Sequence, residues 1–276
     1  MGSGNDFKKV SAHCLVKPGE RADIASRSAR FDAGLDDDAY SAALLAHHLE
    51  RIADLEYKLY AEGKQSLLVV LQAMDAGGKD GAIRNVLGVA NPNSCRVTAF
   101  KAPSSEELDH DFLWRVHKAT PRKGEIGVFN RSHYEDVLIV RVRELVPKAV
   151  WEKRYQHIND FERLLADSGT KIVKCFLHIS KDEQKERFEK RLEDPRKQWK
   201  ANPVDFEERK RWDAYMEAYE DAINQCSTPW APWYVVPADK KWFRNIVVAE
   251  VIADALEAID PRFPPPSFDV RKAKID

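Results

Sequence analysis

The chain has 276 residues, of which 43% are hydrophobic and 32% are charged, and this fits one large α/β domain or two small ones with a substantial core. Lysine and arginine (44) nearly balance aspartate and glutamate (45), so the bulk charge argues against a general nucleic-acid binder. A local basic channel is still compatible with this balance.

The cysteines and the apolar runs indicate the compartment. Four cysteines lie far apart without a C-x-x-C pair, which is typical of reduced thiols rather than of disulfides or a zinc site: Cys14, Cys95, Cys175 and Cys226. The first ten residues, MGSGNDFKKV, contain no apolar leader, and no run approaches the ~18 apolar residues of a membrane span. We therefore expect a cytoplasmic protein without a membrane partner.

We expect three regions along the chain. Residues 1–36 are polar and irregular, which predicts an arm over the surface of a single domain at 37–260. That domain begins with a helix, because leucine and isoleucine recur at three- and four-residue steps from Leu45 to Leu59. The Pro-rich stretch 261–276 cannot continue the last helix and is predicted to be a tail.

The stretch Leu67–Leu87 predicts a phosphate cradle. The apolar run Leu67–Leu71 is short enough for a buried parallel strand, and it passes through a glycine-rich turn into a helical pattern. Glycines let backbone N–H groups approach phosphate oxygens, the helix N-terminus adds partial positive charge, and Lys79 adds a full charge. The other loop residues expected to contact phosphate are Ala76, Gly77, Gly78, Asp80 and Gly81. The alternative is an ordinary strand–helix turn with an exposed lysine.

This loop departs from the P-loop (Walker A) pattern G-x-x-x-x-G-K-[ST]. Ala73 replaces the first glycine, and Asp80 replaces the hydroxyl residue that usually holds Mg²⁺. Any metal must therefore find other oxygen ligands, and Asp75 inside the loop is the first candidate.

A second group of candidates follows the strand predicted at Ile126–Asn130. The segment Arg131-Ser-His-Tyr-Glu-Asp136 lies at its C-terminal end, the edge at which α/β sheets bind ligands. Glu135 and Asp136 are the choices for a Walker-B-type carboxylate that holds Mg²⁺, and Arg131 could neutralise phosphoryl charge. The alternative is a capping aspartate beside a surface arginine.

The region from about 180 to 225 is predicted to be a helical lid. Ser180-Lys-Asp-Glu183 is a capping signature, and the helix after it carries Arg187 and Arg191 on one face. These arginines could close over bound phosphates. Alternatively, Glu183 simply pairs with Arg187 along a solvated helix.

The remaining elements complete an alternating pattern of strands and helices. Helices are expected at Ser105–Lys118 and from about Asp205 to Gln225, and further strands at Arg96–Lys101, Lys171–Ile179 and Trp233–Val236. Alternation of this kind predicts an α/β fold with a parallel sheet covered by helices on both faces.

Three long motifs together resemble the family-2 polyphosphate kinases: Ala73-Met-Asp-Ala-Gly-Gly-Lys-Asp-Gly81, Phe129-Asn-Arg-Ser-His-Tyr-Glu-Asp136 and Arg191-Leu-Glu-Asp-Pro-Arg-Lys-Gln-Trp-Lys200. The resemblance extends from about Asp37 to Ile259. It implies a P-loop kinase-like fold with a helical lid, assembled as a homodimer or homotetramer. It also implies reversible transfer of a terminal phosphoryl group between inorganic polyphosphate and a nucleotide, with Mg²⁺, or Mn²⁺ as an alternative metal.

The resemblance also implies roles for individual residues. Asp75 resembles the metal-binding and catalytic aspartate of the loop, and Lys79 the phosphate-binding lysine. Arg131 and Arg191 resemble the arginines that contact the phosphoryl group in transit.

Asn130 stands where many members of that family have aspartate. This form resembles a single-domain subgroup that accepts nucleoside monophosphates as well as diphosphates. We therefore expect AMP and ADP as acceptors and ATP as a product, with GMP and GDP as further candidates. Because Asn130 offers the metal no carboxylate, we assign the second metal ligand to Asp136.

A near-neutral protein needs a basic groove to bind an anion as dense as polyphosphate. The cations that could line such a groove are Lys79, Arg84, Lys101, Arg122, Lys123, Arg187, Arg191 and Lys200.

Two other functions are alternatives. An ATP-dependent nucleotide kinase could use the same fold, but the missing P-loop hydroxyl counts against it. A non-catalytic polyphosphate- or nucleotide-binding regulator would keep the cradle without turnover, and the intact loop and arginines count against that. Nucleic-acid binding by stacking is disfavoured because Trp199 is a lone aromatic.

Overall fold

The structure is a computed structural model that describes residues 7–273. Within these residues a six-stranded sheet has the order β1-β6-β5-β2-β4-β3. Strands β2 to β6 are mutually parallel, and the short edge strand β1 is antiparallel to β6. Their bounds are Leu15–Val16 (β1), Ser66–Gln72 (β2), Cys95–Ala99 (β3), Ile126–Asn130 (β4), Thr170–His178 (β5) and Trp233–Pro237 (β6).

The central strand β2 positions the site. Every residue of β2 is buried, because helices cover both faces of the sheet. The strand is therefore mostly apolar, since alternation of polar and apolar residues would place polar side chains in the core. Leu71 of β2 pairs with Asn130 of β4, and Gln72 pairs with Phe176 of β5. The segments that follow β2 and β4 therefore leave the sheet side by side.

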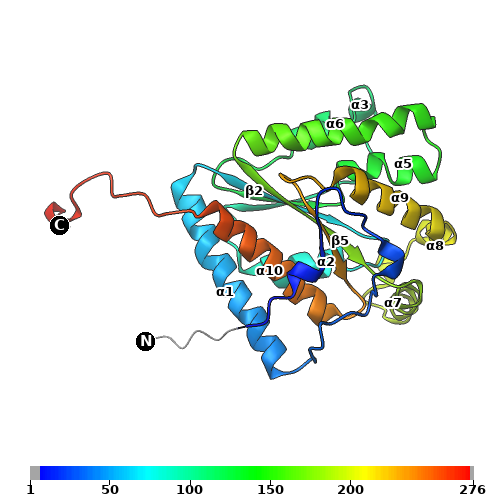
Figure 1. The fold of residues 1–276 in the computed structure, drawn as a ribbon, viewed down its shortest axis with the longest axis horizontal. Coiled ribbons are helices and arrows are strands. Elements are labelled where there is room, and N and C mark those ends of the chain that lie inside the picture. Colours follow the sequence, from blue (N-terminus) through cyan, green and yellow to red (C-terminus); the bar gives the residue numbers. More distant parts are fainter. Residues whose placement is uncertain (1–6, 274–276) are drawn as a thin grey trace.

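The long helices form two layers (Figure 1). Helices α1 (Ala39–Glu62) and α10 (Lys241–Ile259) pack on each other on one side of the sheet, and α2 (Lys79–Val86) packs against α10. Helix α6 (Lys148–Asp167) lies on the other side and packs against α9 (Trp212–Cys226). The predicted α/β class with both sheet faces covered is confirmed.

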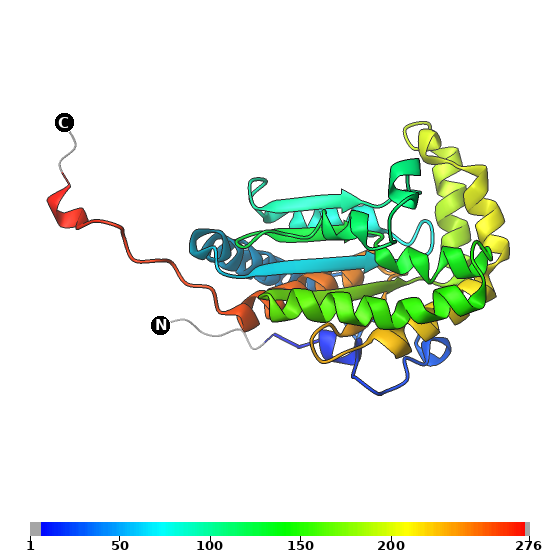
Figure 2. The same ribbon diagram turned by 90° about the horizontal axis from the view of Figure 1, so that it is seen from above.

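A third group of helices stands beyond the carboxyl ends of the strands (Figure 2). It contains α7 (Lys181–Glu193), the 3₁₀ turn η5 (Gln198–Lys200) and α8 (Pro203–Lys210). The predicted cap is present, because Ser180 Oγ accepts a hydrogen bond from the Glu183 N–H. The single helix expected from Asp205 to Gln225 is wrong, since the chain leaves helical geometry at Arg211, between α8 and α9.

The prediction of one helix at Ser105–Lys118 is also wrong. The structure has two short helices there, α3 (Ser105–Leu108) and α4 (Trp114–His117). Asp111 Oδ1 accepts a hydrogen bond from the Leu113 N–H, and this local turn competes with helix continuation. The remaining short elements are α5 (Ile139–Val142) and the 3₁₀ turns η1 (Ser11–His13), η2 (Ile24–Ser26), η3 (Leu87–Val89), η4 (His133–Asp136) and η6 (Val270–Lys272).

The N-terminal segment contributes more than a surface arm. Its strand β1 extends the sheet, and the Glu250 carboxylate of α10 accepts hydrogen bonds from the N–H groups of Val10 and Ser11, each at 2.9 Å. The segment from 261 leads away from the domain (Figures 1 and 2). Residues 1–6 of the predicted arm and 274–276 of the predicted tail lie outside the described residues. Across 7–273, no helix is long and apolar enough to cross a membrane.

Candidate active site

The loop between β2 and α2 includes two residues in the left-handed backbone region, which favours glycine. Ala76 and Gly78 have φ angles of 59° and 99°, both in the left-handed region. A Cβ on Gly77 would lie 2.5 Å from the Cβ of Ala73, so only glycine fits there. The loop leads directly into the N-terminus of α2, where unpaired N–H groups and the helix dipole favour an anion.

Lys79 is the first residue of α2 and is buried beside the loop. Its Nζ donates a hydrogen bond to the Ala73 carbonyl oxygen at 2.9 Å. Burial lowers the pKa of Lys79 to about 8, and the positive charge of Arg131 adds to this, whereas Asp75 opposes it. A bound anion would raise this pKa again, so the ammonium group is suited to hold phosphate.

Asp75 in the loop meets Arg131 after β4. Arg131 Nη2 lies 2.5 Å from Asp75 Oδ1, and both side chains are partly exposed. Arg131 has a φ of 61°, which is uncommon for a non-glycine residue, and its N–H donates to the Leu71 carbonyl of β2 at 3.1 Å. The sheet register therefore sets the position from which this arginine reaches the loop.

Residues of α7, η5 and α8, together with Asn130 of β4, complete this side of the site. Arg191 at the end of α7 forms an ion pair with Asp205 of α8 at 3.3 Å. Lys200 lies 3.6 Å from the Asp80 carboxylate. Asn130 Nδ2 also donates a hydrogen bond to Asp80 Oδ1, at 2.8 Å.

These groups surround a cavity of about 490 Å³, which we call the phosphate pocket. Its lining combines loop backbone with cations and carboxylates: the residues from Asp75 to Asp80, together with Lys101, Asn130, Arg131, Arg191, Lys200 and Asp205. The sequence thus identified most of this pocket. Asp205 was missed, because an isolated aspartate near a helix N-terminus carries no distinguishing pattern.

A second cavity of about 460 Å³ adjoins the first, and we call it the adjoining pocket. The two cavities share Phe100, Lys101, Ala102 and Arg131. The adjoining pocket has a more apolar wall, to which Phe100, Leu108, Phe112, Ile139, Val140, Leu145 and Val146 contribute. Charged groups also line it, among them Arg115, Asp136, Arg143 and Arg154.

Asp136 does not face the phosphate loop as predicted. It lines the adjoining pocket and is paired with Arg154, whose Nη1 lies 2.9 Å from Asp136 Oδ1. Burial raises the pKa of Asp136 to about 6. Its neighbour Glu135 accepts a hydrogen bond from Gln72 Nε2 at 3.2 Å, at the end of the central strand. Both adjacent carboxylates line the adjoining pocket but have different partners, and the sequence could not distinguish them.

Arg187 also differs from the prediction. It is buried and lies outside the lining of the phosphate pocket. Its guanidinium donates to the carbonyls of Ala76, Ala238 and Asp239 and to the Glu183 carboxylate. Arg187 thus fixes the back of the loop, and the alternative pairing with Glu183 is present as well.

Gln184, one turn earlier on α7, has a similar role that the sequence did not reveal. Its Nε2 donates to the carbonyl oxygen of Asp75 at 2.9 Å. Helix α7 therefore holds the backbone carbonyls of two consecutive loop residues, Asp75 through Gln184 and Ala76 through Arg187.

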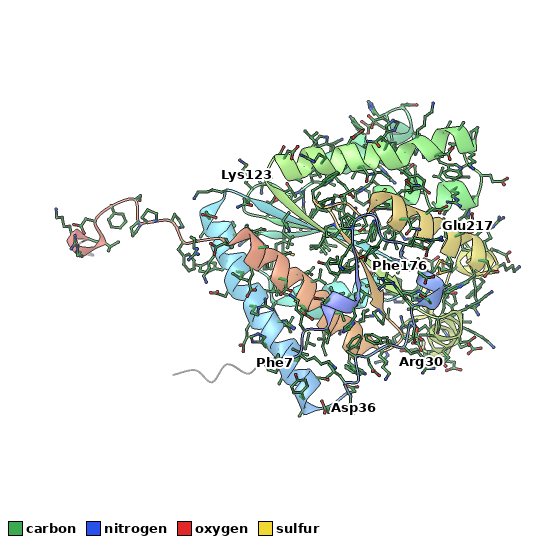
Figure 3. The ribbon with its side chains drawn as sticks, in the orientation of Figure 1. Phe7, Arg30, Asp36, Lys123, Phe176 and Glu217 are labelled. Carbon is green, nitrogen blue, oxygen red and sulfur yellow. The ribbon has the colours of Figure 1, made fainter. Side chains whose placement is uncertain are left out.

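Three further residues that were predicted to contact phosphate lie outside the phosphate pocket. Arg122 and Lys123 precede β4 and lie at the opposite end of the sheet from the pocket; Figure 3 shows Lys123 there. Arg122 pairs with Glu125 at 2.5 Å. Arg84 is exposed on α2 and outside the pocket lining.

Gly81 also lies outside the phosphate pocket and faces Arg244 of α10 instead. A Cβ at position 81 would be 3.3 Å from Arg244 Nη2. This glycine therefore makes room for a helix–helix contact.

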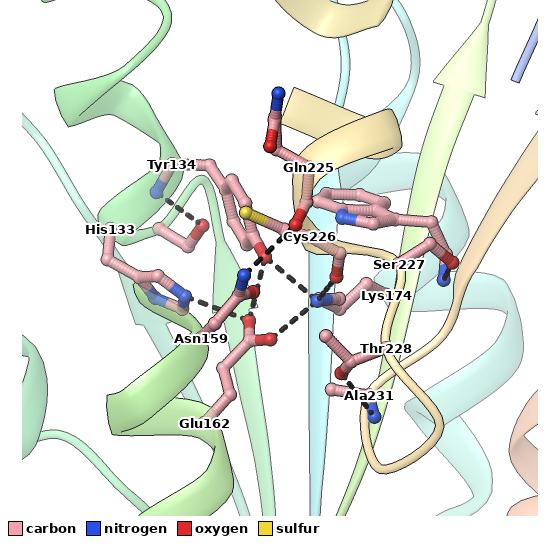
Figure 4. A network of polar contacts seen from close by, with 12 residues as sticks. His133, Tyr134, Asn159, Glu162, Lys174, Gln225, Cys226, Ser227, Thr228 and Ala231 are labelled. Carbon is pink, nitrogen blue, oxygen red and sulfur yellow. Dashed lines mark hydrogen bonds and ion pairs between the residues drawn. The ribbon is translucent and has the colours of Figure 1, made fainter. Parts of the chain in front are cut away.

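A buried polar network anchors the segment that carries Arg131 (Figure 4). Lys174 Nζ lies 2.5 Å from Glu162 Oε2, and the other carboxylate oxygen lies 3.1 Å from His133 Nε2. The Tyr134 hydroxyl donates to Glu162 and accepts from Lys174. His133 and Tyr134 are thus motif residues with a structural role, buried between β4 and α6.

The carboxylates of the phosphate pocket fit a divalent metal. Among residues 7–273 no three histidine, cysteine or acidic side chains form a complete metal site. Mg²⁺, however, is commonly held by one or two carboxylates together with water and substrate phosphates. Asp75 and Asp205 line the same pocket, and burial together with the charge of Asp75 raises the pKa of Asp205. Added positive charge would therefore be favourable here.

Comparisons with known proteins agree with this geometry. A family model described as polyphosphate kinase 2 matches residues 34–264. The AMP/ADP-polyphosphate phosphotransferase of Meiothermus ruber is 54% identical over 234 residues, which are 85% of this chain and 86% of the relative. The ADP-polyphosphate phosphotransferase of Rhodopseudomonas palustris is 45% identical over 261 residues, 90% of each chain. The crystal structure of polyphosphate kinase 2 from Arthrobacter aurescens TC1 superposes with a TM-score of 0.92 at 46% identity, covering 96% of this chain and 95% of that one.

Proposed function

The chain belongs to the polyphosphate kinase 2 family, and on this basis we propose that it catalyses reversible transfer of the terminal phosphoryl group of inorganic polyphosphate to nucleotides. The observation that carries the proposal is the phosphate pocket, in which loop backbone, Lys79, Arg131 and Arg191 surround one cavity. Such a lining is suited to several consecutive phosphates.

The two cavities suggest where each substrate binds. The phosphate pocket is bordered mainly by charge and backbone, and it receives polyphosphate in our proposal. The adjoining pocket offers apolar side chains for a base and ribose, and it receives the nucleotide. Arg131 lines both cavities, at the point where the acceptor phosphate would meet the donor.

Phosphoryl transfer requires chiefly positioning and charge neutralisation from the protein. We propose that Lys79, Arg131 and Arg191 neutralise the negative charge of the transferred phosphoryl group. Asp75 with Asp205 would hold Mg²⁺, or Mn²⁺, and the metal would neutralise phosphate oxygens when bound. Because an acceptor phosphate is already ionised at neutral pH, no strong general base is needed.

We propose AMP and ADP as acceptors, with ATP formed from ADP. The names of the two relatives support adenine nucleotides. The hydrogen bond from Asn130 to Asp80 gives a reason for an amide at position 130, because an aspartate there would lie against the Asp80 carboxylate and be repelled by it. GMP and GDP are further candidates to be tested alongside.

The lid, the assembly and the compartment are also proposals. We propose that residues 180–225 open and close over the phosphate pocket, since Arg191 and Asp205 of this region line it. We further propose a homodimer or homotetramer in the cytoplasm. Free, mainly buried cysteines support a reducing compartment, and burial raises the pKa of Cys14 to about 12.

Product analysis tests the function. Purified protein is incubated with Mg²⁺, long-chain polyphosphate and AMP, ADP, GMP or GDP in separate reactions, and a second series replaces polyphosphate with ATP. ADP and then ATP formed from AMP would support both the reaction and the acceptors. Product from diphosphates alone would overturn the monophosphate assignment, and transfer only from ATP would favour the ordinary nucleotide kinase. An Asp75→Asn variant, which keeps the side-chain shape, serves as the control for contaminating kinases.

A further inference from the structure

Gly78 at the end of the phosphate loop and Gly81 in the first turn of α2 make room for an arginine that lies far away in the sequence. A Cβ on Gly78 would lie 2.1 Å from Nη1 of Arg244, and one on Gly81 would lie 3.3 Å from its Nη2. Arg244 belongs to α10 and is only 2% exposed. Its guanidinium is therefore pressed against the N-terminus of α2 from behind.

Arg244 has no acidic partner within the described part of the chain. Both Nε and Nη2 donate to the same neutral atom, Oδ1 of Asn245, at 3.2 and 2.7 Å. Among residues 7–273 no carboxylate lies within 4.0 Å of it, and its Nη1 makes no hydrogen bond there. Burial lowers the pKa of Arg244 to about 10, and nearby Arg187 adds to this, so the group is still charged at neutral pH.

Two other buried cations have acidic partners, whereas Lys79 at the phosphate pocket donates, within the described residues, only to the Ala73 carbonyl. Lys174 is paired with Glu162 at 2.5 Å, and Arg187 with Glu183 at 2.7 Å. An uncompensated buried charge is costly, and it is normally paired or hydrogen-bonded to a charge of opposite sign. At Arg244 one layer of loop backbone separates the charge from the pocket that receives phosphate.

We propose that Arg244 is a positioning residue for polyphosphate, whose charge is balanced through the loop by the phosphate chain itself. It makes no direct contact with the substrate. It stabilises the bound polyanion electrostatically, and its packing leaves no room for a Cβ at position 78 and little at position 81. The inference rests on the proposed function, because it assigns polyphosphate to the phosphate pocket.

Asn245→Asp tests this inference without removing Arg244. The new carboxylate would occupy the place of the amide that already accepts from Arg244, and would thus supply the missing counter-charge inside the protein. We expect the KM for polyphosphate to rise about threefold to tenfold, the order of effect of one poorly screened charge. The KM for the nucleotide stays unchanged, and the melting temperature of the ligand-free protein stays the same or rises.

A merely structural Arg244 predicts a different result. Asn245→Asp would then strengthen the local pair and leave the KM for polyphosphate unchanged, which would overturn the inference. Asn85→Asp is the matched control, because it adds the same charge on the exposed side of α2, where solvent screens it. An equal rise in KM in this control would also overturn the inference, since a general loss of positive charge would explain it.

Ligand-induced stabilisation gives a second readout, measured with polyphosphate alone and no nucleotide. Polyphosphate should raise the melting temperature of the wild-type protein more than that of Asn245→Asp or Arg244→Met. Wild-type protein that neither binds polyphosphate nor turns it over would overturn the proposed function and the inference together. Wild-type binding and turnover with an unaltered Asn245→Asp variant would overturn the inference alone.

Discussion

Asp75 and Arg131 form an ion pair across the carboxyl edge of the sheet, with 2.5 Å between Oδ1 and Nη2, although they follow different strands. In the absence of substrate this pair satisfies both charges. When a phosphate chain and a metal enter the pocket, Arg131 can turn to phosphate and Asp75 to the metal. In our proposal the same two residues therefore order the loop through their pairing and take part in the chemistry of the site.

Asp75→Asn should impair catalysis far more than folding. The amide keeps an oxygen that can accept from Arg131 but loses the charge needed for the metal. We expect kcat to fall about 10²- to 10³-fold, with little change in stability because the pair is partly exposed. Steady-state kinetics with saturating Mg²⁺ and a thermal melt would check this, and near-normal turnover would remove Asp75 from its assigned role.

Arg187→Ala and Arg191→Ala should separate a structural arginine from a substrate-binding one. Arg187 is buried and its donors are engaged by the loop and by Glu183, so its loss should cost about 3–5 kcal/mol of unfolding free energy. Arg191 lines the phosphate pocket, so its loss should cost under about 1 kcal/mol of stability but about 10²-fold in kcat. Urea unfolding and kinetics on both variants give the comparison. The reverse pattern would contradict our assignment.

Gly78→Ala should be strongly destabilising, because the new Cβ would meet Arg244 and because Gly78 has a φ of 99°. We expect a loss above about 2 kcal/mol together with loss of activity. Gly88→Ala is the matched control, since no described atom lies within 4 Å of a Cβ built there. Its stability should stay within about 0.5 kcal/mol of wild type. Equal effects of the two substitutions would mean that neither the contact with Arg244 nor the left-handed backbone at Gly78 is important.

Protonation of His48 should lower the stability as the pH falls from 7 to 5, whereas Asp136, whose pKa burial raises to about 6, acts in the opposite direction. The Nδ1 atom of His48 lies 2.8 Å from Arg51 Nη1, and because arginine can only donate, this nitrogen must be unprotonated. Burial lowers the pKa of His48 to about 4, and the charge of Arg51 adds to this. Burial also lowers the pKa of His133.

The sign follows from proton linkage. Below the ordinary histidine pKa of about 6.5, the unfolded chain binds protons that the folded state excludes, so stability is present above that pH and is lost towards the folded pKa. His48 alone should account for about 2 kcal/mol between pH 7 and 5. Urea unfolding at several pH values would measure this, and His48→Asn should flatten the curve. An unchanged slope in that variant would assign the effect elsewhere.

The local parts of the site could be predicted from the sequence because their residues are neighbours in the chain. The apolar run of β2, the glycine turn and the helix at Lys79 are adjacent, and short-range sterics and burial determine their conformation. The motif after β4 could be placed at the same edge of the sheet because parallel strands end together. Its ion pair with the loop follows from that register.

The choice among similar residues could not be made in this way. Asp136 and Glu135 are adjacent and both line the adjoining pocket, yet Asp136 pairs with Arg154, whereas Glu135 accepts a hydrogen bond from Gln72 at the end of the central strand. Arg187 and Arg191 share a helix face, yet one is buried against the loop and the other lines the pocket. Spacing gives the face of a helix but not the distance of each turn from the sheet.

By itself the sequence determined the fold class, the cradle and the three motifs, because these depend on residues that are close along the chain. The tertiary structure alone decided which charges face the phosphate pocket, brought Asp205 into it and placed Arg244 behind the loop. Those relationships depend on how helices from distant parts of the chain are rotated and packed against one sheet edge. Side-chain direction at such contacts is set by the packing of the whole domain, which no local pattern encodes.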